Sequence, residues 1–163
     1  MAMDSGKGVI QKKVLIQASP TVIFRALTES KELAHWFCDR AASDPKVGGE
    51  VRASWSVGKE GRSQRGRAMF TILEPDSRVE FCWVEEGGRK ISEAERHSTS
   101  FAIRLKRGTS EVTVCDQGPP LEDEEAFDLL DRGWITVLRD LKEHCEARQR
   151  NARRQSVGKA QAG

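Results

Sequence analysis

The sequence lacks the long apolar segments of membrane proteins and a large excess of charge of either sign. No apolar run approaches the roughly 20 residues that a helix needs to cross a bilayer. Residues 1–8 are polar and lack the apolar stretch of a secretory signal. The 27 basic residues nearly balance the 25 acidic ones, which leaves a formal net charge of +2. We therefore expect a cytoplasmic protein with no membrane span and no nucleic-acid partner.

Motifs for metal, nucleotide or covalent chemistry are also missing. The cysteines are widely spaced, with no C-x-x-C pair, which excludes a zinc ribbon and favours small reduced hydrophobic residues. No spacing supplies the three or four converging ligands of a metal site. No glycine-rich loop fits a nucleotide-binding motif, and no nucleophile motif is present. We expect no metal, no cofactor and no catalytic nucleophile. The four cysteines are Cys38, Cys82, Cys115 and Cys145.

The periodicity of the apolar residues predicts an α+β domain, and 163 residues suit a single one. A first strand over Val14–Ala18 ends at Ser19 and Pro20, which are typical of a helix start. Two short helices follow, the second ending near Phe37. From Glu50 to Val114 the apolar period is mostly two, which predicts successive antiparallel strands. In the strand near residue 70 we expect Ala68, Phe70 and Ile72 to share one face.

After Gly118 the apolar period changes to 3.6, which predicts one long helix. Its stripe ends near Arg148, and the residues beyond it are basic and polar. We therefore expect a folded domain over residues 9–147 and a basic, disordered tail over residues 148–163. The stripe consists of Phe127, Leu130, Trp134, Val137, Leu138, Leu141 and Cys145.

These residues, in this order, resemble the ligand-binding superfamily named after START and Bet v 1 proteins, and most nearly its domains similar to the Hsp90 ATPase activator. The resemblance covers roughly residues 12–147. It implies a helix-grip fold, in which a curved antiparallel sheet of about seven strands surrounds a long C-terminal helix, with two short helices after the first strand. The matching residues are Ala18, Ser19, Pro20, Val22, Phe24, Leu27, Thr28, Leu33, Trp36, Phe37, Gly48, Gly49, Gly66, Phe81, Trp83, Gly118, Gly133, Trp134, Leu138 and Leu141.

The resemblance implies a pocket between the sheet and the long helix, and no single activity. Members of the superfamily include lipid carriers, hormone receptors and polyketide cyclases. The co-chaperones also carry a separate N-terminal domain, for which this chain has no room, so we do not expect their role in stimulating Hsp90. Many relatives carry His or Glu two residues before the glycine that corresponds to Gly118, whereas this chain has Asp116.

Strand parity and the helical stripe together predict which side chains line the pocket. The apolar candidates are Trp36, Phe37, Trp55, Phe70, Phe81, Trp83, Phe101, Ile103, Leu130, Trp134 and Leu138. Parity carries Glu85, His97 and Asp116 onto the same face. If Phe81 pairs with Phe101, Glu85 falls opposite His97, as a carboxylate beside an imidazole. Such a pair either orients a polar head group, acts as a general base, or is a solvated contact at the rim.

The function predicted from these features is the binding of a small hydrophobic or amphipathic molecule, such as a lipid, in an internal cavity. The first alternative is an enzyme of the cyclase or hydratase type, in which Glu85, His97 or Asp116 moves protons. The second is a protein-interaction module related to Hsp90. We favour a binding protein over an enzyme, and a homodimer is an open alternative to a monomer.

Overall fold

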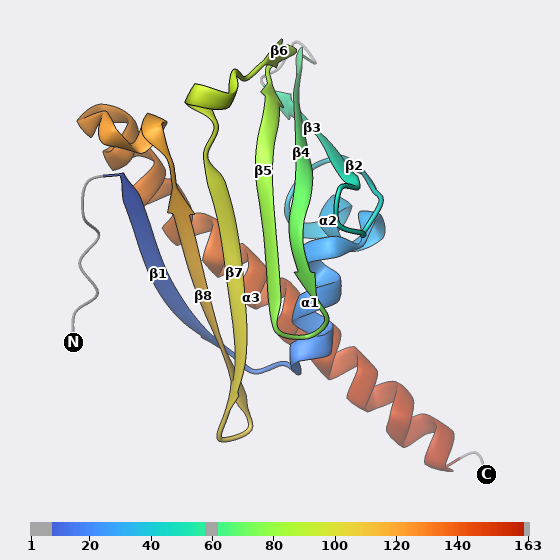
Figure 1. The fold of residues 1–163 in the computed structure, drawn as a ribbon. Coiled ribbons are helices and arrows are strands. Elements are labelled where there is room, and N and C mark those ends of the chain that lie inside the picture. The colour runs from blue at the N-terminus through green and yellow to red at the C-terminus, as the bar shows by residue number, and fades with distance from the viewer. Residues whose placement is uncertain (1–7, 58–61, 162–163) are drawn as a thin grey trace.

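The computed structural model describes residues 8–57 and 62–161 (Figure 1). The prediction that no secretory signal is present was based on the polar N-terminal residues, of which residues 1–7 lie outside this range. The elements, in chain order, are β1 (Val9–Ile16), α1 (Pro20–Thr28), α2 (Ser30–Trp36), β2 (Arg40–Ser43), β3 (Glu50–Val57), β4 (Arg62–Glu74), β5 (Arg78–Glu86), β6 (Arg89–Lys90), β7 (Ser98–Lys106), β8 (Thr109–Gln117) and α3 (Glu124–Gln161), with 3-10 turns η1 (Glu93–Glu95) and η2 (Pro119–Glu122).

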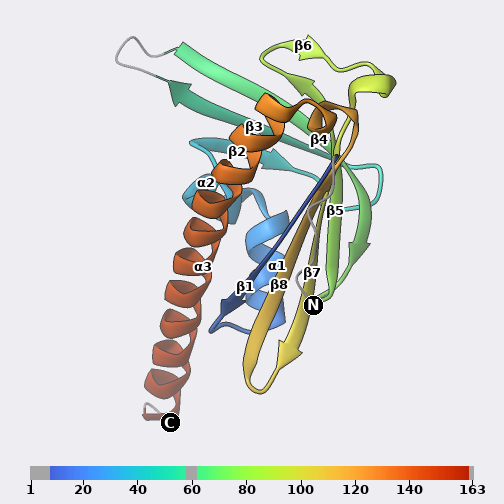
Figure 2. The same ribbon diagram turned by 90° about the vertical axis from the view of Figure 1, so that its left-hand side faces the viewer.

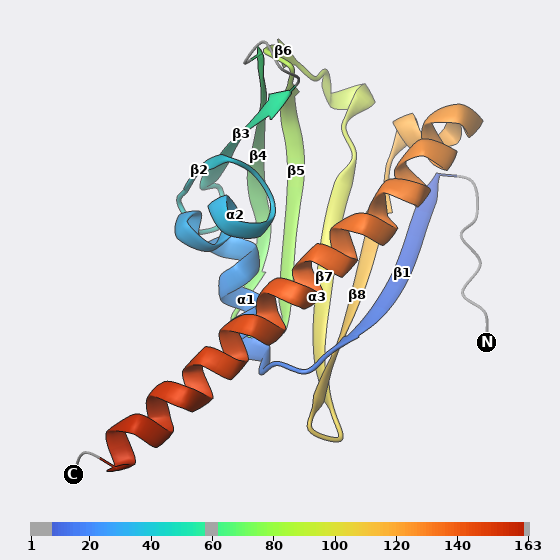
Figure 3. The same cartoon turned by 180° about the vertical axis from the view of Figure 1, so that it is seen from behind.

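All the strands belong to one antiparallel sheet in the order β1-β8-β7-β5-β4-β3-β2, and the two-residue β6 pairs with β5. The three α-helices lie on one face of this sheet, and α3 crosses it diagonally (Figures 2 and 3). In the part of the chain that the structure describes, no α-helix covers the other face (Figures 2 and 3). The predicted α+β helix-grip fold is therefore confirmed, with the two short helices directly after β1.

The first helix begins as the sequence predicts. The Ser19 hydroxyl accepts a hydrogen bond from the Val22 amide at 3.2 Å, and Pro20 occupies the first turn, where its missing N–H costs nothing. Ile23 and Leu27 are buried toward the sheet. This cap fixes the direction of α1 and places its apolar stripe under α3.

Two β-bulges in the β4–β5 pair change the predicted parity. Ala68 pairs with Trp83 and its neighbour Arg67 pairs with Glu85, so Val84 is an extra residue on β5. On the other strand, Phe70 pairs with Phe81 and Ile72 with Glu80, so Thr71 is extra on β4. The expectation that Ile72 shares the face of Phe70 is wrong, since Leu73 packs against the core instead.

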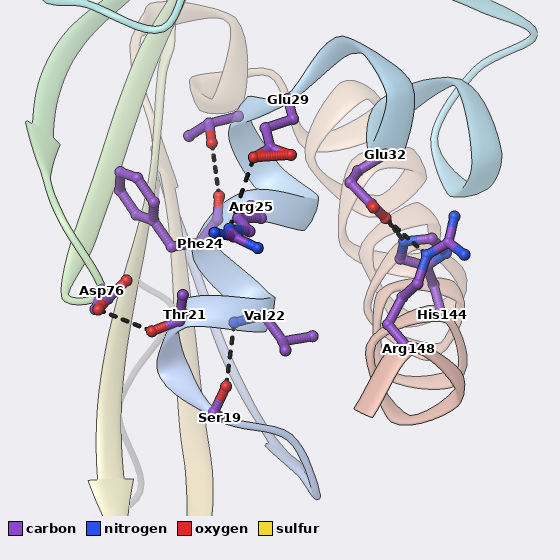
Figure 4. A network of polar contacts seen from close by, with 11 residues as sticks. Ser19, Thr21, Val22, Phe24, Arg25, Glu29, Glu32, Asp76, His144 and Arg148 are labelled. Carbon is purple, nitrogen blue, oxygen red and sulfur yellow. Dashed lines mark hydrogen bonds and ion pairs between the residues drawn. The ribbon is translucent and has the colours of Figure 1, made fainter. Parts of the chain in front are cut away.

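The middle of α3 closes the hydrophobic core. Leu138 is 5% exposed, and Leu141 and Cys145 are 0% exposed. Next to this apolar contact, Glu32 of α2 accepts hydrogen bonds from His144 and from Arg148 of α3, the latter at 3.0 Å (Figure 4). Burial would raise the pKa of Glu32, but its hydrogen bonds with His144 and Arg148 and the charge of Arg148 outweigh this effect and lower that pKa. The C-terminal half of the helix is thus attached to α2 by both packing and charge.

Where a disordered tail was predicted, α3 continues to Gln161 and projects beyond the sheet (Figure 3). Arg148 contacts Glu32, and the Gln149 side chain accepts from the Ser19 amide at 2.9 Å, so the helix is still anchored where its apolar stripe ends. The residues beyond are rich in Arg, Ala and Gln, which are good helix formers. Among the described residues, no helix is long and apolar enough to cross a membrane.

All four cysteines lie in the described part of the chain and are free thiols. Cys38 and Cys145 are buried, as expected of small hydrophobic residues, whereas Cys82 and Cys115 are half-buried. Burial in the core raises the pKa of Cys145 to about 12, and the carboxylates of Glu32 and Glu146 add to this effect. Cys145 is therefore a neutral packing residue.

Candidate ligand-binding cavity

A cavity of about 300 Å³ lies between the sheet and the N-terminal half of α3. Its walls come from all three helices and from the central strands β5, β7 and β8. This volume is at the lower end of the range found for small-molecule sites. The lining residues are Leu27, Leu33, Trp36, Phe37, Phe81, Trp83, Glu86, His97, Thr99, Phe101, Asp116, Leu130, Gly133, Trp134 and Val137.

Aromatic rings form a continuous wall around this space. The ring centroids of Phe37 and Trp83 are 6.4 Å apart, and those of Trp83 and Phe81 are 5.8 Å apart. The series continues from Phe81 to Phe101 at 6.0 Å and from Phe101 to Trp134 at 5.8 Å. Each ring packs against its neighbours at distances that favour aromatic pairs. The rings support one another and leave the centre of the cavity unfilled.

One polar cluster interrupts the apolar wall, and Asp116 of β8 is at its centre. Asp116 is 1% exposed. Its Oδ1 accepts from His97 Nδ1 at 2.8 Å and from the Thr99 hydroxyl at 3.4 Å, and its Oδ2 accepts from Trp134 Nε1 at 3.1 Å. Both carboxyl oxygens of Asp116 are therefore hydrogen-bonded. The cluster thus joins β7, β8 and α3 across the cavity.

His97 lies between two carboxylates. Its Nδ1 contacts Asp116, and its Nε2 is 3.5 Å from Oε1 of Glu86 on β5. Burial would lower the pKa of His97, but the hydrogen bonds and charges of Asp116 and Glu86 outweigh it and raise the pKa to about 9. The hydrogen bond from His97 in turn lowers the pKa of Glu86. His97 is therefore an imidazolium at neutral pH, with both N–H groups donated.

Gly118 makes room for His97 at the end of β8. A Cβ atom at Gly118 would lie 2.7 Å from the Arg96 carbonyl oxygen and 2.7 Å from His97 Cα, and the φ of Gly118 is +151°. Any other residue would push the backbone before β7 away from β8. The glycine thus holds His97 within reach of Asp116.

Glu85 does not belong to this cluster, contrary to the prediction. Phe81 pairs with Thr99 rather than with Phe101, and the bulge at Val84 turns Glu85 to the opposite face of the sheet. There its carboxylate lies 3.4 Å from Arg67 Nε. Glu86 takes its place beside His97. The alternation of apolar residues along β5 gives no signal for the extra residue, so Glu86 was missed.

The cluster offers neither a free imidazole base nor a metal site. Because both ring nitrogens of His97 donate to carboxylates, neither has a lone pair for a substrate proton. In residues 8–57 and 62–161, no group of three or more His, Cys, Asp or Glu side chains is arranged to hold a metal ion. The arrangement is suited to holding a polar group of a ligand at one side of an apolar cavity.

The sequence matches the family model described as "Activator of Hsp90 ATPase homolog 1-like protein" over residues 17–146. The chain belongs to this family. The resemblance inferred from the sequence is thereby confirmed. The match begins directly after β1 and covers the other strands, both short helices and the part of α3 that closes the core. No curated protein matches the chain in sequence.

Several solved structures share the fold of this chain. NE0264 from Nitrosomonas europaea has a TM-score of 0.75 at 17% identity, with 91% of this chain and 99% of that one covered. The Aha1 protein of Colwellia psychrerythraea, solved as a dimer in solution, has a TM-score of 0.69 at 22% identity, with 85% and 96% covered. DynU16, from the dynemicin biosynthetic locus, has a TM-score of 0.71 at 17% identity, with 88% of this chain covered. The chain spans 49% of DynU16, and at these identities the similarity is one of fold.

Nine of the site residues predicted from the sequence line the cavity, and five do not. Phe70, Ile103 and Leu138 are buried in the core, because the space next to them is filled. Trp55 contacts Phe37 and Trp83 at the edge of the sheet without lining the cavity, and Glu85 lies on the other face. That the remaining residues bind a ligand stays a prediction. They are Trp36, Phe37, Phe81, Trp83, His97, Phe101, Asp116, Leu130 and Trp134.

Proposed function

We propose that this protein binds a small hydrophobic or amphipathic molecule in the cavity under α3. The observation that carries the proposal is the unfilled volume of about 300 Å³, walled by aromatic rings and marked on one side by a single polar cluster. A mostly apolar cavity with a few convergent polar groups is the usual form of a small-molecule site. A small lipid or another compact apolar compound fits this description.

Fluorescence titration with phenylnaphthylamine, a neutral apolar dye, tests the proposal. We expect saturable binding of one dye per chain. Val137→Phe should weaken it at least tenfold, because Val137 lines the cavity and the larger ring occupies its space. Ile135→Phe makes a similar change on the solvent side of α3, where Ile135 is 61% exposed, and should bind as the parent does. Equal affinity of all three proteins, or no binding at all, would contradict the proposal.

An enzyme of the cyclase or hydratase type is the second candidate, favoured by the convergence of His97, Asp116 and Glu86 on the cavity. In that role His97 would donate a proton rather than accept one, because it is already protonated at neutral pH. Dimer formation and contact with a chaperone partner are weaker proposals, since they draw on the Colwellia relative and on the family description alone.

A further inference from the structure

The charged groups that line the cavity carry an excess of negative charge. Among the described residues that line the cavity, the only acidic or basic side chains are Glu86, His97 and Asp116. Two carboxylates face one imidazolium, which leaves one negative charge beside an apolar space. If His97 lost its proton, the excess would grow to two. The sign of the charge therefore does not depend on the protonation of His97.

The hydrogen-bond donors of the polar cluster are already used within it. His97 donates with both ring nitrogens, to Asp116 and to Glu86. The Thr99 hydroxyl and the Trp134 indole both donate to Asp116. A carboxylate or phosphate placed at this cluster would have to displace one of these bonds, and it would also meet the charge of Glu86. An anionic head group is therefore disfavoured on two grounds.

Glu86 is the acceptor that a ligand can reach. Its side chain is 59% exposed, whereas that of Asp116 is 1% exposed. Within the described residues only its Oε1 has a partner, His97, so Oε2 remains able to accept. The aromatic wall ends at Trp83 on the same strand. An ammonium group there would meet a carboxylate next to aromatic rings, and both kinds of group can attract cations.

We propose that the ligand of this cavity is a cationic amphiphile, with its apolar body among the aromatic rings and an ammonium group at Glu86. The inference rests on the proposed function and narrows it to one class of ligand. The same charge pattern disfavours fatty acids and other anionic amphiphiles.

Competition against phenylnaphthylamine at neutral pH tests the inference with octylamine, octanol and octanoate, which share one chain length and differ in the charge of the head group. We expect octylamine to compete about fivefold more strongly than octanol, which is the upper end of what a half-exposed ion pair contributes. Octanoate should compete more weakly than octanol by a similar factor. Glu86→Gln should reduce the ratio of octylamine to octanol affinity to about one.

Glu85→Gln is the matched control, because it removes the same charge from the adjacent residue on the other face of the sheet. It should keep the preference for octylamine. Octanol or octanoate binding as tightly as octylamine would overturn the inference and leave the proposed function intact. So would a preference for octylamine that persists in Glu86→Gln or disappears in Glu85→Gln. If neither the dye nor any of the three compounds binds, the proposed function and the inference fail together.

Discussion

Before α3 projects beyond the sheet, its residues 124–148 lie over one face of it (Figure 2). This part has an N-terminal half, up to Val137, and a C-terminal half, from Leu138, and the two halves meet the sheet in different ways. In the C-terminal half, Leu141 and Cys145 are fully buried in the core. In the N-terminal half, Leu130 and Val137 are half-buried and border the cavity. There Trp134 donates a hydrogen bond to Asp116 and packs against Phe101, and Asp131 forms an ion pair with Lys12 of β1 at 3.0 Å. The cavity therefore lies where the helix is attached by polar contacts instead of by interlocking aliphatic side chains.

The difference shows how one helix can both stabilise the fold and leave a site open. The C-terminal half is fixed by packing and by the contacts of Glu32 with His144 and Arg148 (Figure 4). Because that half is anchored, the N-terminal half can stand off the sheet without losing its position. We therefore expect the contacts of the C-terminal half to contribute more to the free energy of folding, and those of the N-terminal half to contribute more to ligand binding.

The largest expected effect is the difference between Leu141→Ala and Leu130→Ala. Leu141 is 0% exposed, so its truncation should leave a new cavity and lower the free energy of unfolding by about 2 to 5 kcal/mol. Leu130 already borders empty space, so the same change there should cost about 1 kcal/mol or less. Urea denaturation followed by circular dichroism measures both. Equal losses would mean that the two halves pack alike and would remove the basis of the comparison.

A smaller effect should come from pH, through the polar cluster that attaches the N-terminal half. The pKa of His97 rises from an ordinary 6.5 to about 9 on folding, so the folded state holds this proton more tightly than the unfolded state. The resulting stability is fully present below pH 6.5 and is lost as the pH rises through about 9. It amounts to at most about 3 kcal/mol.

Urea denaturation at a series of pH values measures this loss, and an NMR titration of His97 gives the pKa directly. The His97→Gln variant should lose the dependence between pH 6.5 and 9, since it has no proton to release. If the free energy of unfolding of this variant still fell with pH as steeply as that of the parent, another group would cause the dependence. It would also show that the charge of His97 does not help to attach the N-terminal half of α3 to the sheet.

Much of this comparison follows from local patterns in the sequence. The apolar stripe from Leu130 to Cys145 predicts the helix and its buried face, and Ser19 with Pro20 predicts the start of α1. The position of Asp116 two residues after Val114 correctly places it on the inner face of β8. These predictions succeed because capping and periodicity depend on residues that are close in the chain.

The errors arise where long-range contacts decide the structure. The bulge at Val84 depends on how β5 pairs with β4. It places Glu86 at the cavity, where Glu85 was predicted. Nor does the stripe of α3 distinguish Leu138, which is buried, from Leu130, which borders the cavity. The continuation of the helix beyond Arg148 depends in part on Glu32, which is 116 residues away in sequence. Such contacts are fixed by the packed sheet and have no local signature.

The smallest expected effect tests whether the N-terminal half has room for more side chain. Gly133 lies in α3 at the cavity, and a Cβ atom there would meet nothing within 4 Å. Gly133→Ala should therefore raise the free energy of unfolding by up to about 1 kcal/mol, because alanine restricts the unfolded chain and favours the helix. Gly158→Ala, at the projecting end of the same helix, also meets no atom and should give less, because helix ends fray. A destabilised Gly133→Ala protein, measured by urea denaturation, would mean that the helix lies closer to the sheet than the cavity implies.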